Sequence, residues 1–125
     1  MTFNPVAALN VIECRKIISN NDPKAVDLGS QTSSINNVFV KNLLNNNKTI
    51  NNTQKKNLDN LSSAQSFTTE DYFKSVGFKE YKSIDINGAY NSLQFDLNKN
   101  ILETYNYKEE YDLVINNGTG EHVFN

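Results

Sequence analysis

The spacing of apolar residues predicts that the chain begins with an amphipathic helix. Between Pro5 and Ile18, apolar side chains recur with helical spacing, at Val6, Leu9, Ile12, Cys14, Ile17 and Ile18. Pro5 suits the first turn of a helix, because the N–H that proline lacks would have no partner there. The helix is expected to end at Asn20-Asn21-Asp22-Pro23, since the residue before a proline avoids helical backbone angles.

Four short apolar runs predict strands. They are Lys24–Gly29, Tyr81–Ile86, Ser92–Leu97 and Tyr111–Ile115, each ending in or followed by Gly or Asn. The last run has a β-branched end and is typical of a central parallel strand that is buried on both faces. Helical connections are expected before the second and fourth runs. The pattern therefore predicts an α/β fold with a mostly parallel sheet of about four strands.

The middle of the chain has a less definite pattern. Residues 35–44 fit a helix, but a Val-Phe-Val run also favours a strand at Asn37–Val40. Residues 45–60 are polar and rich in Asn and Lys, and we expect them to form a surface loop or a poorly ordered helix. Order returns over residues 68–77, where acidic residues suit the first turn of a helix and a glycine suits its end.

Composition narrows the class of protein. A chain of 125 residues has the length of one domain, so residues 1–125 are expected to form a single domain. The formal net charge of -2 offers no basic footprint for nucleic acid. One cysteine, Cys14, permits no intramolecular disulfide, and one Cys with one His makes no Cys/His zinc cluster. With no run near the ~20 apolar residues of a membrane span, a cytoplasmic location is expected.

Each predicted strand has an acid or an amide at its carboxyl end, followed by Gly or Asn. The four strand ends read Asp27-Leu28-Gly29, Asp85-Ile86-Asn87-Gly88, Asp96-Leu97-Asn98 and Asn116-Asn117-Gly118. In an open parallel sheet these ends line one crevice, where ligands bind. An acid after the second strand can accept hydrogen bonds from the hydroxyls of a ribose, and a glycine after the first allows close approach to the backbone. These are also ordinary turn residues, but four such ends in one series favour a ligand site.

Taken together, the segments resemble class I S-adenosylmethionine-dependent methyltransferases. The resemblance is carried by VDLGS at Val26–Ser30, SIDING at Ser83–Gly88, FDLN at Phe95–Asn98 and YDLVINNGTGEHVFN at Tyr111–Asn125. The last segment is similar to a subgroup whose fourth strand runs into a Gly-Thr-x-Glu-His-Val loop. The resemblance implies a Rossmann-like fold, S-adenosylmethionine as cofactor, and methyl transfer to an acceptor that the sequence does not identify.

The resemblance also implies which residues would hold the cofactor. Asp27 and Gly29 would lie against the methionine part of S-adenosylmethionine. Asp85 would bind the ribose hydroxyls. Asp96 would lie near the adenine, with Leu97 beside the ring.

The loop after the fourth strand would form the methyl-transfer side of the site. Asn116, Asn117 and Gly118 would form the floor near the sulfonium and the methyl acceptor, and Glu121 and His122 would face the acceptor. A neutral imidazole near pH 7 can take a proton from a nucleophile, so His122 is a candidate general base. A lone His beside Glu at a helix start is also commonly structural, and transfer to a good nucleophile needs only alignment and desolvation.

The sequence departs from the family in two respects. The turn Gly29-Ser30-Gln31-Thr32 lacks the family's second and third glycines, and four strands are predicted where the family has a seven-stranded sheet. The chain is therefore expected to be the cofactor-binding half of a longer enzyme, or a truncated product. One alternative is a truncated, non-catalytic Rossmann-like domain. Another is a nicotinamide-dependent oxidoreductase, which the lack of G-x-G-x-x-G after the first strand argues against.

Overall fold

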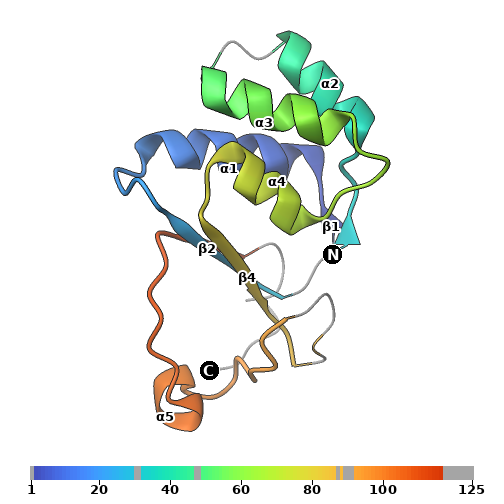
Figure 1. The fold of residues 1–125 in the computed structure, drawn as a ribbon. Helices are drawn as coiled ribbons and strands as arrows, with labels where there is room; N and C mark the ends of the chain where they lie inside the picture. The colour runs from blue at the N-terminus through green and yellow to red at the C-terminus, as the bar shows by residue number, and fades with distance from the viewer. Residues whose placement is uncertain (1, 30–31, 47–48, 87, 89–91, 117–125) are drawn as a thin grey trace.

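The computed structural model describes residues 2–29, 32–46, 49–86, 88 and 92–116. Within them the chain forms an α/β fold with a small parallel sheet and flanking helices (Figure 1). The helices are α1 (Pro5–Ile17), α2 (Asn37–Asn46), α3 (Asn52–Ser62), α4 (Thr69–Val76) and α5 (Ile101–Tyr105). The strands are β1 (Thr2–Phe3), β2 (Lys24–Leu28), β3 (Thr32–Ser33), β4 (Glu80–Ile84) and β5 (Leu113–Ile115).

The central strand of the main sheet is β2. The sheet has three parallel strands in the order β4-β2-β5. Leu28 of β2 is opposite Ile84 of β4, and Asp27 is opposite Ile115 of β5. The short strands β1 and β3 form a separate parallel pair. The predicted parallel sheet is therefore confirmed for the strands that begin near residues 24, 81 and 111. The prediction that the last of them is central and buried on both faces was wrong, because β2 is the central strand of the three and Val114 of β5 is exposed.

The strand expected at residues 92–97 does not form. Leu93 makes one parallel bridge to the end of β4, with backbone hydrogen bonds of 2.8 and 2.9 Å. The Phe95 N–H then donates to the Leu93 carbonyl (2.9 Å), so the backbone bends away from the sheet after this single bridge. The prediction was wrong because the Phe95 ring stacks on Tyr105 of α5, 4.3 Å away between ring centroids, and the chain follows that contact.

The core lies between one face of the sheet and a layer of helices. Figure 1 shows α1 and α4 next to the sheet, with α2 and α3 packed beyond them. Aromatic rings fill the centre of the core. The centroid of the Phe73 ring lies 5.5 Å from that of Phe3 and 4.6 Å from that of Tyr81. The hydroxyl of the fully buried Tyr72 donates to the Ala8 carbonyl (2.8 Å) and so connects α4 to α1. Burial of these large rings is the main stabilising contribution to the fold.

Helix α3 occupies much of the 45–60 segment, for which the sequence predicted a polar surface loop or a poorly ordered helix. Asn51 caps the helix: its side chain accepts the Gln54 N–H (2.8 Å), and the Gln54 side chain accepts the Asn51 N–H (3.0 Å). Gln54 also donates to the Val76 carbonyl of α4 (2.7 Å), and Leu58 is fully buried. Of the two alternatives the loop was wrong, because a good cap and a few buried side chains hold this otherwise polar helix against its neighbours.

The other helices form where the sequence predicted them, although α1 buries Ala8, Val11 and Ile12 and leaves Val6, Leu9 and Ile17 of the predicted apolar spacing exposed. Residues 35–44 lie mainly in α2, so the helical alternative is confirmed and the strand alternative is wrong. At the start of α4, Thr68 accepts the Asp71 N–H (3.1 Å) and Asp71 accepts the Thr68 N–H (2.9 Å). The helix ends at Gly77, whose φ of +117° is the left-handed conformation that glycine adopts readily.

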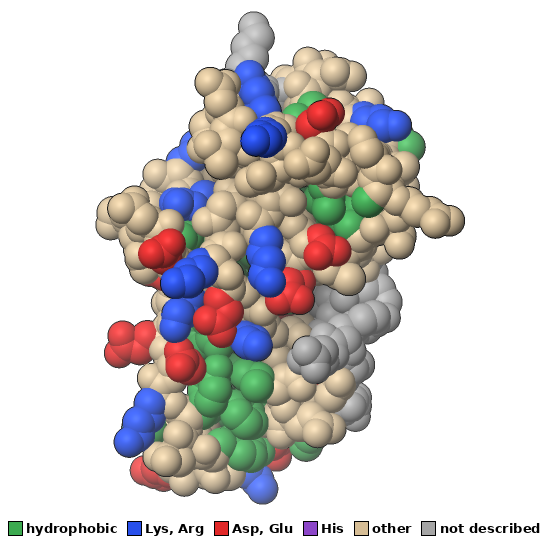
Figure 2. All heavy atoms as spheres, viewed as in Figure 1, with side chains coloured by type: hydrophobic (Ala, Val, Ile, Leu, Met, Phe, Trp, Pro, Cys, Tyr) green, Lys and Arg blue, Asp and Glu red, His purple; other side chains and the backbone are tan. Residues whose placement is uncertain are grey.

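The face of the molecule in Figure 2 carries charges of both signs. Lys and Arg side chains are interspersed with Asp and Glu side chains over its middle, and hydrophobic side chains gather below them (Figure 2). Ion pairs on the helices include Lys74 with Glu70 (3.5 Å) and Lys16 with Glu13 (3.1 Å). Exposed pairs of this kind contribute little to stability, so apolar burial decides how the helices pack.

Candidate functional site

Three adjacent strands end side by side at the carboxyl edge of the sheet. Gly29 follows β2, Asp85 follows β4 and Asn116 follows β5. Because Leu28 is opposite Ile84 in a parallel pair, Gly29 and Asp85 are the next residues in register. The Gly29 N–H donates to the Ile84 carbonyl (2.7 Å) and extends the ladder past the end of β2. The structure thus brings together three residues that the sequence assigned to one site.

The chain reverses its direction across the sheet beside β2. After β2 it crosses to one side to form β4, and it later returns to the other side of β2 to form β5. In open α/β sheets such a reversal creates a crevice outside the carboxyl ends of the strands, and ligands bind there. Gly29 and Asn116 lie on the two sides of this reversal, because they follow β2 and β5.

Gly29 has a structural reason to be a glycine. Its φ is +101°, a backbone angle that residues with a side chain rarely adopt. The chain can therefore turn sharply at the end of β2, and no Cβ stands between the backbone and a ligand. Residues 30–31, the next part of the predicted cofactor loop, lie outside the described residues.

Asp85 is half-buried at the end of β4, and its backbone is held from both sides. Its N–H donates to the Leu93 carbonyl (2.9 Å), and its carbonyl accepts the Gly88 N–H (2.9 Å). These two bonds fix the point at which the carboxylate leaves the sheet. A carboxylate offers two acceptor oxygens, which suit a ligand with two neighbouring hydroxyls.

Asp96 and Leu97 lie just past the Leu93 bridge, and both are half-buried. The Asp96 N–H donates to the Tyr105 hydroxyl (2.8 Å), and its carboxylate oxygen Oδ1 accepts the Asn98 N–H (2.9 Å). Tyr105 lies in the helical connection expected before the fourth strand and was not among the predicted site residues. The tyrosines that recur in this connection, Tyr105 and Tyr107, could have indicated that it packs against another apolar part of the chain.

Asp27 is not on the surface of this edge. Its side chain is fully buried, and it accepts a hydrogen bond from the Tyr81 hydroxyl (3.1 Å). Burial raises the pKa of Tyr81, and the charge of Asp27 raises it further. Since Asp27 and Ala25 are two positions apart on β2, they face the same side, and Ala25 belongs to the helix-facing core. The structure therefore places the Asp27 side chain in the interior, two residues before the turn at Gly29.

The acceptor side of the predicted site lies largely outside the described residues. Asn116 is exposed directly after β5. Asn117, Gly118, Glu121 and His122 fall beyond the part of the chain that the structure describes. Their roles in methyl transfer stay predictions from the sequence.

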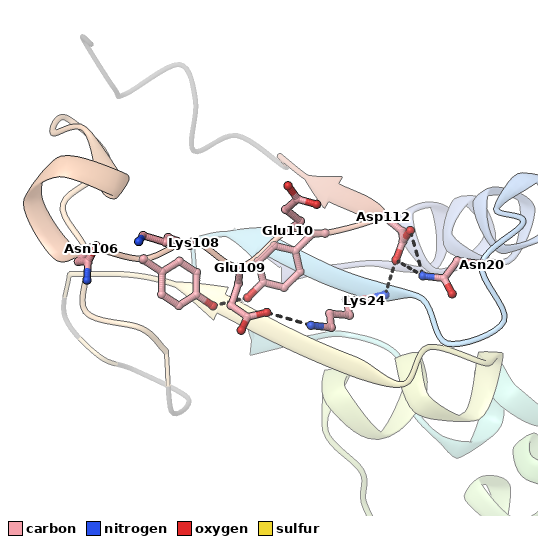
Figure 3. A pocket seen from close by; sticks show the side chains of 9 residues that line it. Asn20, Lys24, Asn106, Lys108, Glu109, Glu110 and Asp112 are labelled. Atoms are coloured by element: carbon pink, nitrogen blue, oxygen red, sulfur yellow. Dashed lines mark hydrogen bonds and ion pairs between the residues drawn. The ribbon is translucent and has the colours of Figure 1, made fainter.

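A separate cavity of about 680 Å³ lies at the opposite, amino-terminal edge of the sheet. Figure 3 shows it between β2 and the connector of residues 106–112. Lys24 Nζ lies 2.9 Å from a Glu109 carboxylate oxygen, and this hydrogen bond raises the pKa of Lys24. Asp112 accepts the backbone N–H of Lys24 (2.9 Å) and the side-chain amide of Asn20 (3.2 Å). These charged groups bind one another and fasten the connector to the sheet, so we assign the cavity a structural role.

Comparisons with protein-family models, curated proteins and solved structures gave no match. Among the residues that the structure describes, no cluster of His, Cys, Asp or Glu side chains is arranged to hold a metal ion. No helix in the same residues has the length and apolarity to cross a membrane. We therefore infer the function from the geometry of the carboxyl edge and from the sequence.

Proposed function

We propose that this protein binds S-adenosylmethionine at the carboxyl edge of β2, β4 and β5 and transfers its methyl group to an acceptor. The observation that supports this most is the parallel register, which aligns Gly29, Asp85 and Asn116 at one edge beside the reversal of strand order. The resemblance of the four sequence segments to methyltransferases supplies the identity of the cofactor.

The arrangement of the elements supports a Rossmann-like fold. Along the chain the order is β2, β4, the bridge at Leu93 and β5, whereas in space it is Leu93, β4, β2 and β5. Numbered along the chain, this is the 3-2-1-4 order with which doubly wound nucleotide-binding sheets begin. Such sheets use an acid after the second strand to bind ribose, and Asp85 has that position.

The side chains at this edge fit the parts of the cofactor. Asp85 would accept hydrogen bonds from the ribose hydroxyls, and the bare backbone at Gly29 would let the ligand approach β2. Asp96 would lie near the adenine. Asp27 is fully buried, so in this proposal it supports the turn at Gly29 instead of contacting the methionine part directly.

The chain's contribution to the reaction would be alignment and exclusion of water. When bound, S-adenosylmethionine supplies a methyl group on a positively charged sulfur. Asn116, exposed at the end of β5, would help to define the space that the acceptor enters. Correct orientation of the acceptor lowers the barrier without covalent participation of the protein. Glu121 and His122 are candidates to remove a proton from an acceptor that carries one.

Calorimetric titration with S-adenosylmethionine and S-adenosylhomocysteine tests the proposal. We expect the folded protein to bind both. Asp85→Ala should weaken binding by about tenfold or more, because it removes charge-assisted hydrogen bonds to the ribose hydroxyls. The expected change is in affinity and not in the cooperativity of unfolding, since Asp85 is only half-buried.

Asp59→Ala is the matched control. Asp59 is exposed on α3, so the substitution makes the same change in charge on the helical layer and should leave affinity unchanged. A folded protein that binds neither ligand would refute the proposal, as would an Asp85→Ala variant that binds as tightly as the wild type. A parallel titration with NADH separates the oxidoreductase alternative, which predicts tighter binding of the nicotinamide cofactor.

A further inference from the structure

The short helix α5 returns Tyr105 to the turn that carries Asp96. Asn100 caps the helix by accepting the Glu103 N–H (3.0 Å), and the Thr104 N–H donates to the Asn100 carbonyl (2.9 Å). The chain leaves the helix at Asn106, a non-glycine residue with a φ of +51°. This single compact turn places Tyr105 over residues that precede it by nine or ten positions.

Tyr105 makes two contacts with that turn. Its ring stacks on Phe95, with centroids 4.3 Å apart and an angle of 18° between the planes. Its hydroxyl accepts the Asp96 N–H (2.8 Å). The Tyr107 ring also packs edge-on against Phe95, with ring centroids 5.0 Å apart. The backbone of Asp96 is therefore held by a side chain that itself is fixed by stacking.

The carboxylate of Asp96 has one oxygen engaged and one available. Oδ1 accepts the Asn98 N–H (2.9 Å), and the Lys99 N–H donates to the Asp96 carbonyl (3.1 Å), which closes the turn. Among the described residues, Oδ2 has no hydrogen-bond donor. A carboxylate oxygen accepts hydrogen bonds only, so its natural ligand group is an N–H or O–H.

We propose that Tyr105 is a positioning residue that directs the free oxygen of Asp96 toward the exocyclic amino group of the bound purine. The inference rests on the proposed function, because it takes S-adenosylmethionine as the ligand of this edge. Tyr105 does not touch the ligand; it holds the Asp96 backbone through its hydroxyl and the Phe95 stack. The pair thus selects a purine with an amino group over one with a carbonyl at the same position.

A double-mutant cycle with two ligands tests this. Wild type, Tyr105→Phe, Asp96→Asn and the double variant are titrated with S-adenosylhomocysteine and with S-inosylhomocysteine, in which a carbonyl replaces the amino group. Tyr105→Phe keeps the stack and removes only the acceptor for the Asp96 N–H. We expect it to weaken S-adenosylhomocysteine binding about fivefold, to weaken the inosine analogue far less, and to have no further effect in the Asp96→Asn background.

Tyr107→Phe is the matched control. It makes the same substitution in the same cluster, where the Tyr107 hydroxyl bonds Tyr111 and not Asp96, and affinity should stay within about twofold of the wild type. A protein that binds S-adenosylhomocysteine with an unchanged preference in Tyr105→Phe, or additive effects in the cycle, would overturn the inference and leave the proposed function standing. A wild type that binds neither ligand would overturn both.

Amide hydrogen exchange in the wild type gives a second test that needs no variant. Because the Asp96 N–H is hydrogen-bonded to Tyr105, it should exchange slowly, and saturation with S-adenosylhomocysteine should slow it further. An Asp96 amide that exchanges at the rate of an exposed loop in both states would contradict a positioning role for Tyr105.

Discussion

At the scale of residues, hydroxyl groups in the interior connect β4 to β2 and α4 to α1. The Tyr81 hydroxyl donates to Asp27 (3.1 Å), and the Tyr72 hydroxyl donates to the Ala8 carbonyl (2.8 Å). Burial raises the pKa of both tyrosines, and Asp27 adds to the effect at Tyr81. A buried phenolate would face a carboxylate or a carbonyl oxygen without a proton between them, so both hydroxyls must stay protonated in the fold.

These raised pKa values predict alkaline destabilisation. In the unfolded chain tyrosine has its ordinary pKa of 10.0, so above that pH the unfolded chain releases protons that the folded chain keeps. The stabilisation is fully present below about pH 10 and is lost as the pH rises above it. The free energy of unfolding should fall by about 1.4 kcal/mol per pH unit for each buried tyrosine. Urea unfolding at pH values from about 8 to about 12 measures this slope.

Tyr72→Phe is the informative comparison for the alkaline slope. It removes one of the titrating hydroxyls, so its slope should be smaller than that of the wild type by one tyrosine's share. Lys24 and Tyr111 also have raised pKa values, and the comparison cancels them because both proteins contain them. Identical slopes in the two proteins would contradict the assignment of the effect to Tyr72.

At the scale of elements, side-chain caps decide where helices begin. Both α3 and α4 start with a reciprocal capping box, formed by Asn51 with Gln54 and by Thr68 with Asp71. The α4 start was predictable because its acidic first turn and its terminal glycine both lie within one short segment of the sequence. The α3 start was not, because Asn is so frequent in this chain that one capping Asn does not stand out, and the partner that buries Leu58 comes from other helices.

Removal of the α4 cap should destabilise the protein measurably. Thr68→Ala leaves the Asp71 N–H without its side-chain acceptor, and we expect a loss of about 1 kcal/mol in the free energy of unfolding. Thr68→Ser retains a hydroxyl at the same position and should lose much less. Urea unfolding of the two variants decides the point, and equal losses would show that the hydroxyl is not the stabilising group.

At the scale of the whole molecule, contacts between distant parts of the chain hold β5 against β2. Asp112 accepts the Lys24 N–H (2.9 Å), and the Asp112 N–H donates to the Lys24 carbonyl (2.9 Å). These residues are separated by 88 positions. Since Asn116 follows β5, the same contacts hold one side of the candidate site beside the end of β2.

Asp112→Ala should loosen this edge of the sheet. The variant leaves the Lys24 N–H and the Asn20 amide without their acceptor, and we expect a loss of about 1–2 kcal/mol in the free energy of unfolding. Amide exchange at Leu113 and Ile115 should accelerate more than exchange in α1. Glu110→Ala is the control, because Glu110 is exposed and points away from Lys24 (Figure 3). Equal effects of the two variants would contradict a specific role for Asp112.

The sequence by itself determined the elements whose signals are local. The apolar runs near residues 24, 81 and 111, each bounded by Gly or Asn, are strands of the parallel sheet, and the helical spacing from Pro5 marks α1. It also indicated that Gly29, Asp85 and Asn116 would lie at one edge of the sheet, because the carboxyl ends of parallel strands share one edge. These inferences need only the periodicity of short segments and the parallel order of strands.

Only the tertiary structure decided the rest. The chain leaves the sheet after Leu93 because the Phe95 ring stacks on Tyr105. Residues 52–62 form a helix because other helices bury Leu58. The hydrogen bond between Tyr81 and Asp27 joins residues 54 positions apart. It holds Asp27 in the interior, although Asp27 had been expected to contact a ligand. Each of these outcomes depends on which distant side chain fills a given space, and local periodicity carries no information about that partner.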